Sequence, residues 1–122
     1  AKLHGRAVLD SVRILDNRCV YTVVTTDELK EYGCTVKATD GIVDQLRIIE
    51  GIEIAFLLYQ TGNPDEYKVS LRTNSKVDVS RIAQSFGGGG HVKAAGCTMT
   101  GKPEEIVGKI SGKIREQWEE LE

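Results

Sequence analysis

The chain has 122 residues, enough for one domain whose core needs no disulfide support. A net charge of −2 excludes a strongly basic nucleic-acid coat, and no apolar run approaches the roughly 20 residues of a membrane span. The three cysteines show no zinc-ligand spacing, and the first residues show no signal-peptide pattern. We therefore expect no metal held by this chain, no membrane contact and a cytoplasmic location.

The first half of the chain alternates short helices with β-rich segments. Thr26 is the expected N-cap of one helix, because acidic residues follow it and Gly33 is placed to end it. Apolar spacing and β-branched content predict these elements in order: a helix at 2–12, a hairpin of 12–15 with 19–25, helices at 26–31 and 42–49, and a strand buried on both faces at 52–59.

The second half begins with a polar turn and an alternating strand at 68–73. Asp78 is placed to cap a helix, a small-residue strand follows at 94–99, and Pro103 opens a final amphipathic helix. The expected fold class is α+β, a single domain with a mixed β-sheet of about five strands flanked by helices. The side chains of strand 68–73 divide between two faces: Val69, Leu71 and Thr73 on one, and Lys68, Ser70 and Arg72 on the other.

Four consecutive glycines at 87–90 separate the helix after Asp78 from the strand at 94–99. Each ordered glycine costs roughly 0.5–1 kcal/mol relative to alanine, so the run needs a reason. Without Cβ atoms, main-chain N–H groups can gather round an anion as a nest, whereas an ordinary flexible turn would need no ligand. Residues 68–96 hold five Lys and Arg against one Asp, a net +4 that favours the anion site.

Two side chains near the glycines suit a phosphate. His91 can donate a charge-assisted hydrogen bond to a phosphate oxygen, and Arg72 can add a bidentate one. The sequence contains neither a Walker A motif nor a dinucleotide-binding fingerprint, and it lacks the Asp/His cluster that metal-assisted hydrolysis requires. These residues therefore predict phosphate binding without catalysis by this chain.

Five blocks of the sequence carry a family resemblance: DGIV at 40–43, IEIA at 52–55, VSLRT at 69–73, VDV at 77–79 and AQSFGGGGHVKAAG at 83–96. Together they resemble the DHH-associated C-terminal domain of DHH-family phosphoesterases. The best match is the oligoribonuclease (nano-RNase) and pAp-phosphatase branch. The resemblance covers nearly the whole chain, and its glycine block followed by histidine is the most specific part.

The resemblance implies a two-domain enzyme. Its N-terminal DHH domain binds two manganese ions and performs hydrolysis, and residues 1–122 form the separate C-terminal substrate-binding domain. The implied substrates are short RNA oligomers, 3′-phosphoadenosine 5′-phosphate (pAp) and, in relatives, dinucleotides. The expected partners are thus a nucleotide or short oligonucleotide and the DHH domain. By position, the residues implied to grip a phosphate are Gly88, Gly89, Gly90, His91 and Arg72, with help from Ser70, while Lys93 stands where relatives vary.

Two other functions stay open at this point. A related domain could bind tRNA or single-stranded DNA, as in alanyl-tRNA synthetase tails, and would show a broader basic surface and steeper salt dependence. A structural or dimerisation domain would ignore nucleotides. The chain starts at Ala1 and its single methionine is Met99, which fits initiator removal as well as a piece of a longer polypeptide.

Overall fold

The computed structural model describes residues 2–122. Its elements in chain order are α1 (Lys2–Leu9), β1 (Val12–Ile14), β2 (Cys19–Val24), α2 (Thr26–Glu31), the 3₁₀ helix η1 (Val36–Thr39), α3 (Ile42–Arg47), β3 (Ile54–Gln60), β4 (Glu66–Thr73), α4 (Val79–Ser85), β5 (Gly89–Gly90), β6 (Ala94–Thr100) and α5 (Pro103–Leu121).

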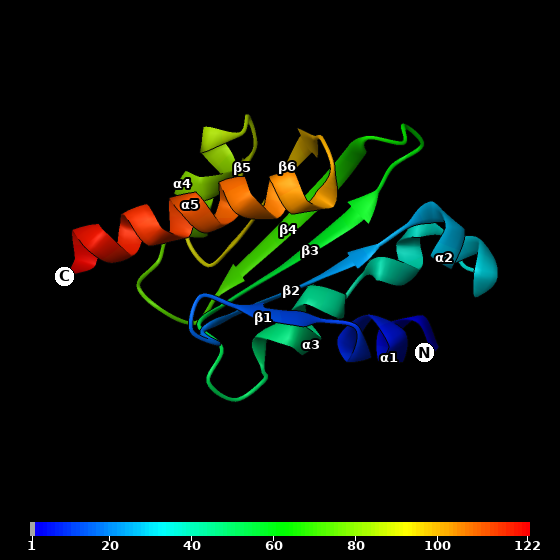
Figure 1. Cartoon of the computed structure of the whole chain (residues 1–122), viewed down its shortest axis with the longest axis horizontal. Coiled ribbons are helices and arrows are strands. Elements are labelled where there is room, and N and C mark those ends of the chain that lie inside the picture. The colour runs from blue at the N-terminus through cyan, green and yellow to red at the C-terminus, as the bar shows by residue number, and fades with distance from the viewer. Residues whose placement is uncertain (1) are drawn as a thin grey trace.

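The strands form one mixed sheet in the order β1-β2-β3-β4-β6-β5 (Figure 1). β2 and β3 run parallel, since the chain returns between them through α2, η1 and α3, and the other neighbours run antiparallel. The α+β class is confirmed. Five of the six strands match the sequence prediction, and the sixth is the two-residue, all-glycine β5, which offers no side-chain alternation to detect.

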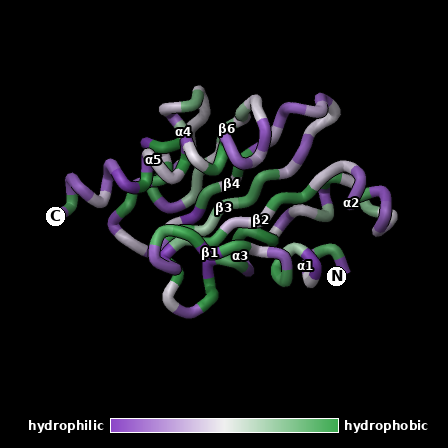
Figure 2. Tube along the Cα trace, in the orientation of Figure 1, coloured by the Kyte–Doolittle hydropathy of each residue, from purple (hydrophilic) through white to green (hydrophobic). Residues whose placement is uncertain are grey.

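Two hydrophobic cores lie on opposite faces of the sheet. The first core lies beneath α4 and α5, and the second lies beneath α1 and α3. Strand β3 serves both, because Ile54–Leu58 are all buried, as the unbroken apolar run predicts. Figure 2 shows this concentration of hydrophobic residues along the central strands. Representative buried residues are Phe56, Leu71, Ile82 and Ile110 in the first core, and Leu3, Val20, Ile42 and Leu46 in the second.

The helices cover the two faces unequally. In β6, Ala95, Cys97 and Met99 are buried towards the first core, whereas Thr98 on the other face is exposed. α3 contacts β2, β3 and β4 on this second face, whereas β6 is packed against α4 on the first face. We call the uncovered surface of β4, β6 and β5 the open face. It carries the side chains of Lys68, Ser70 and Arg72.

Helices α2 and α4 both begin at a residue whose side chain caps the first turn. Thr26 was expected to cap α2, but that assignment is wrong by one residue. Thr25 has the extended backbone of an N-cap, and its hydroxyl accepts a hydrogen bond from the N–H of Glu28. For α4 the expected cap is confirmed, since the carboxylate of Asp78 accepts from the N–H groups of Ser80 and Arg81.

Helix α5 spans 19 residues and lies across the first core (Figure 1). Ile106, Ile110 and Ile114 bury its apolar side. Its opposite side carries charged residues, as expected for an amphipathic surface helix. Within residues 2–122, no helix is both long enough and apolar enough to span a membrane.

Candidate functional site

The first two glycines of the run end helix α4. Gly87 has a φ of +83°, a left-handed conformation that favours glycine. Its N–H donates to the carbonyl of Gln84 (3.1 Å), and the N–H of Gly88 donates to the carbonyl of Ala83 (2.8 Å). This pair of bonds is the Schellman helix cap. Because both N–H groups are used, neither is free to contact an anion.

Close approach to β6 explains two of the glycines. A Cβ at Gly88 would lie 2.2 Å from the carbonyl oxygen of Gly96, and one at Gly90 would lie 2.6 Å from the Cα of Ala95. Gly89 has open space for a Cβ. Gly89 and Gly90 pair with β6 as the edge strand β5. Packing therefore supplies a reason for the glycines that is separate from any ligand.

His91 starts a tight turn that ends at Ala94. The N–H of His91 donates to the carbonyl of Ala94 (2.8 Å), and the N–H of Ala94 donates back (3.2 Å). The carbonyls of the two corner residues are also held: Val92 accepts from the N–H of Val79 (2.9 Å) and Lys93 from that of Thr73 (3.1 Å). The side chains of His91 and Lys93 are exposed. The turn is thus fixed to both α4 and β4 while presenting its side chains outward.

Arg72 lies on the open face, and its side chain is 27% exposed. Its Nε donates to Oδ1 of Asp44 (3.2 Å), and its Nη1 donates to the carbonyl of Leu71 (3.0 Å). The same Asp44 oxygen accepts from Nε of Arg47 (3.1 Å), so one carboxylate faces two guanidinium groups. Within residues 2–122 these bonds use two of the five N–H donors of Arg72, which leaves three donors for a further acceptor.

Two hollows share Tyr59 and Ser70 of the second face. The smaller, of about 240 Å³, adjoins Arg72 and the start of α3; its other lining residues are Thr39, Asp40, Gly41, Val43 and Leu57. The larger, of about 440 Å³, adjoins the end of α4; its other lining residues are Lys68, Val69, Phe86, Gly87, Gly88, Gly96, Cys97 and Thr98. We call them the Arg72 hollow and the glycine hollow.

The structure brings some of the predicted residues together and leaves others apart. Ser70 lines both hollows, Arg72 lines one and Gly88 lines the other. His91 lines neither, and the same holds for Gly89, Gly90 and Lys93. The strand register still relates His91 to Arg72, because Arg72 pairs with Ala94, which is hydrogen-bonded to His91. Two strand spacings, about 10 Å, therefore separate their main chains.

Sequence reasoning missed Tyr59 and gave Lys68 no role. Tyr59 lines both hollows, Lys68 lines the glycine hollow, and the two are direct cross-strand partners. The available signal was positional: Tyr59 follows directly after the buried apolar run of β3, where an aromatic side chain emerges from the core. Lys68 shares the strand face of Ser70 and Arg72.

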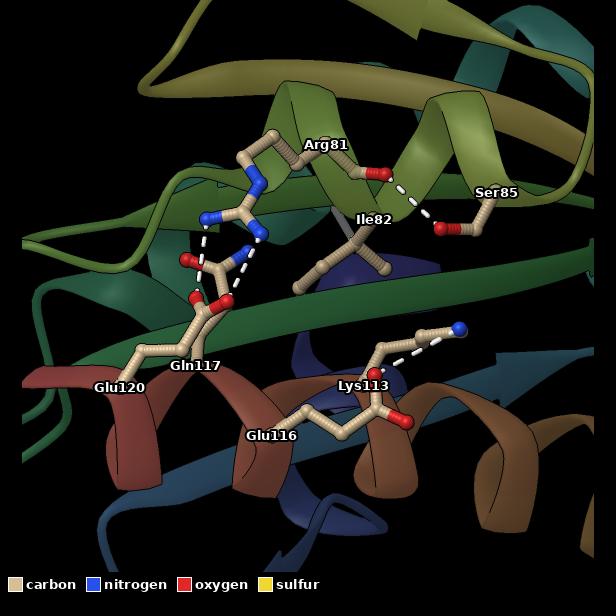
Figure 3. Close-up of a pocket in the computed structure, with 7 residues that line it drawn as sticks. All are labelled: Arg81, Ile82, Ser85, Lys113, Glu116, Gln117 and Glu120. Atoms are coloured by element: carbon tan, nitrogen blue, oxygen red, sulfur yellow. Dashed lines mark hydrogen bonds and ion pairs between the residues drawn. The ribbon is translucent and has the colours of Figure 1, made fainter.

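A third hollow, of about 130 Å³, lies between α4 and α5 (Figure 3). Figure 3 shows Arg81 directed at Glu120, to whose two carboxylate oxygens it donates at 3.0 and 3.2 Å. Lys113 is paired with Glu116 at 3.5 Å. Arg81 and Glu120 neutralise each other across the helix pair, and Lys113 and Glu116 do so within α5, so the hollow is better explained as a contact between helices than as an anion site.

The two buried cysteine thiols, Cys19 and Cys97, are poor nucleophiles. Burial raises the pKa of Cys97 to about 11. Burial, with the nearby charge of Glu53, raises the pKa of Cys19 to about 12. Both thiols are therefore protonated at neutral pH, which excludes thiolate attack by Cys97 beside the glycine segment.

Residues 2–122 hold no group of three or more His, Cys, Asp or Glu side chains placed to bind a metal ion. These residues consequently do not fit the manganese pair that the resemblance assigns to a separate domain.

The family model described as the DHHA1 domain matches residues 16–119. The chain belongs to the DHHA1 family. Among curated proteins, the bifunctional oligoribonuclease and PAP phosphatase NrnA of Thermus thermophilus is 34% identical over 96 residues, which cover 78% of this chain and 29% of the relative. The oligoribonuclease NrnB of Bacillus subtilis is 52% identical over 40 residues, 32% of this chain and 10% of the relative.

A solved structure shows the same fold as this DHHA1 domain. An exopolyphosphatase-related protein from Bacteroides fragilis superposes with a TM-score of 0.84 at 23% identity, covering 94% of this chain and 34% of that one. The DHHA1 domain therefore spans about a third of that protein and less than a third of both curated relatives.

Proposed function

We propose that this DHHA1 domain binds a phosphate of a short oligoribonucleotide or of pAp and positions it for hydrolysis by a separate DHH domain. The names of the related NrnA and NrnB proteins support this class of substrate. The observation that carries the proposal is the Arg72 hollow, where a partly exposed guanidinium and the Ser70 hydroxyl line one cavity of about 240 Å³. A guanidinium and a hydroxyl are both suited to phosphate oxygens.

In this proposal the residues differ in how directly they contact the phosphate. Arg72 and Ser70 contact the phosphate directly. Gly90 and His91 approach the phosphate from the edge of the open face. Gly88 has no free N–H to donate, and its role is to let the main chain lie close to β6 because it has no side chain. Lys93 adds positive charge from the exposed turn. Hydrolysis, with its manganese ions, belongs to the N-terminal DHH domain expected from the family resemblance.

A titration of isotopically labelled protein with pAp tests the proposal. We expect weak binding, with a Kd near the millimolar scale, or about −4 kcal/mol. Arg72→Ala should weaken it about tenfold or more, because a hydrogen bond to a charged group contributes about 1.5–3 kcal/mol. Arg13→Ala is the matched control, since Arg13 is exposed on β1 at the opposite edge of the sheet.

The proposal would be contradicted by chemical shifts that stay unchanged on β4 and residues 87–94 at saturating pAp. Equal binding by the wild type and Arg72→Ala would contradict it as well. Much tighter binding to tRNA, with a steep decrease as salt rises, would favour the long nucleic-acid function instead.

A further inference from the structure

Tyr59 stands where the Arg72 hollow and the glycine hollow meet. It is half-buried near the end of β3, and Lys68 of β4 is its direct cross-strand partner. Its neighbour Leu58 faces the first core, so Tyr59 faces the opposite side of the sheet, together with Ser70 and Arg72. Tyr59 and Ser70 are the two residues that line both hollows.

The surface beside Tyr59 has small residues on β6 and a cationic side chain of β4 at each end. Lys68 and Arg72 lie on the same face of β4, four residues and about 13 Å apart, with Ser70 between them. On the next strand their partners are Thr98, Gly96 and Ala94, which are all small. A planar group can therefore lie against this surface beside the Tyr59 ring.

An aromatic ring among cations on a sheet surface suits a nucleotide better than it suits a bare phosphate. Proteins bind unpaired nucleotides by stacking bases on aromatic side chains while cationic groups follow the phosphates. Tyr59 and Arg72 line the same hollow, so one nucleotide is able to meet both. We propose that Tyr59 stacks on the nucleobase next to the phosphate held by Arg72 and Ser70.

This assignment rests on the proposed phosphate site and extends it to the class of ligand. The ligand is a nucleotide recognised through its base, and inorganic phosphate or polyphosphate lacks the group that Tyr59 binds. Part of the Tyr59 ring also packs against the second core. A test therefore has to keep that packing while removing the aromatic ring.

The experiment compares two ligands, pAp and the matching abasic sugar 3′,5′-bisphosphate, with variants of the full 122-residue chain. Tyr59→Phe keeps the ring, and Tyr59→Leu keeps apolar bulk without it. Tyr32→Leu is the control, because Tyr32 is another half-buried tyrosine packed against the second core and lines neither hollow.

We expect Tyr59→Phe to bind pAp within about twofold of the wild type. Tyr59→Leu should weaken pAp binding by at least about fivefold, since stacking contributes about 1–3 kcal/mol per base. Binding of the abasic bisphosphate should be unchanged by either variant, and Tyr32→Leu should change neither ligand. In NMR spectra, the upfield ring-current shifts of the adenine protons should persist with Tyr59→Phe and vanish with Tyr59→Leu.

The stacking role is overturned if Tyr59→Leu leaves pAp binding intact, or if it weakens both ligands equally. The phosphate site is judged separately, by the effect of Arg72→Ala on the abasic bisphosphate. If Arg72→Ala weakens binding of the abasic bisphosphate while Tyr59→Leu binds pAp normally, the phosphate site is retained and stacking is rejected. If Arg72→Ala does not weaken binding of the abasic bisphosphate, the phosphate site itself is rejected.

Discussion

The four glycines of the run at 87–90 do not all meet the same constraint. Gly87 supplies the left-handed conformation that ends α4, while Gly88 and Gly90 let the main chain pass within van der Waals distance of β6. Gly89 has neither restriction. One residue type therefore serves as a cap, as two points of close contact and as part of an edge strand.

A pair of alanine substitutions separates these constraints. Gly88→Ala should lower the free energy of unfolding by about 1–3 kcal/mol, because its Cβ would overlap the carbonyl oxygen of Gly96 and force the main chain apart. Gly89→Ala should stay within about 0.5 kcal/mol of the wild type. Urea denaturation measures both. Equal stability of the two variants would show that the main chain at Gly88 does not pack against β6 in this way.

The glycine run also marks a limit of prediction from sequence. An absent Cβ lets either a ligand or another strand approach the main chain, and the sequence alone does not distinguish the two. The amphipathic split of β4 was predictable because alternation is local: Val69, Leu71 and Thr73 are buried, and Ser70 and Arg72 reach the hollows. Which side chains of the other face share a hollow depends on strand order, so Tyr59 was missed.

Helix α4 shows how a seven-residue element is stabilised at both ends. Asp78 caps its first turn, and the side chain of Gln117 from α5 bonds both main-chain groups of Asp78, each at 2.8 Å. Gly87 and Gly88 satisfy carbonyls at its end. So short a helix has little stability alone, and these caps compensate.

Asp78 should make stability depend on acid. Burial opposes ionisation, but hydrogen bonds from the Ser80 hydroxyl and from the N–H groups of Arg81 and Ser80 outweigh it and lower the pKa of Asp78. The stabilisation is therefore present above the unfolded-state value near 3.8 and is lost as pH falls through the lower folded-state pKa.

Two substitutions at Asp78 test this. Asp78→Ala should cost about 0.5–2 kcal/mol at pH 7, because the cap is removed. Asp78→Asn should cost little at pH 7, since asparagine caps equally well, and should lose less stability between pH 5 and pH 2 than the wild type does. Urea denaturation across this pH range gives both values. Identical pH profiles for the wild type and Asp78→Asn would assign the acid sensitivity to other carboxylates.

Local signals predicted most helices and strands, and the two misses concern only one or two residues each. The cap at Asp78 was correct because one residue there has a capping side chain before an apolar helix. At α2, two threonines stand side by side, and the end of β2 decides between them. For β5, pairing with β6 creates a strand that its own two residues do not encode.

At the scale of the whole molecule, the sheet is covered on one face and partly open on the other. The open face adjoins both hollows and carries Lys68, Ser70 and Arg72. The remaining two thirds of the related chains lie beyond the region matched here. A partner domain facing this surface would enclose a ligand held on it, which agrees with the proposed division of labour.

Removal of metal provides a test at this scale. Because residues 2–122 hold no cluster of metal-binding side chains, pAp binding by this chain should not change when EDTA is added. Isothermal titration with and without EDTA, after dialysis against metal-free buffer, measures the effect. A loss of binding of more than about twofold would place a metal ion in the binding site and contradict the assignment of phosphate recognition to Arg72 and Ser70.

The hydrogen bond between the N–H of Thr73 and the carbonyl of Lys93 has a consequence for recognition. Thr73 directly follows Arg72, and Lys93 belongs to the turn that carries His91, so this single bond couples the strand to the turn. The main-chain segments that carry Arg72 and His91 are thereby held together. A phosphate arriving between them would lose little affinity to the ordering of a mobile loop.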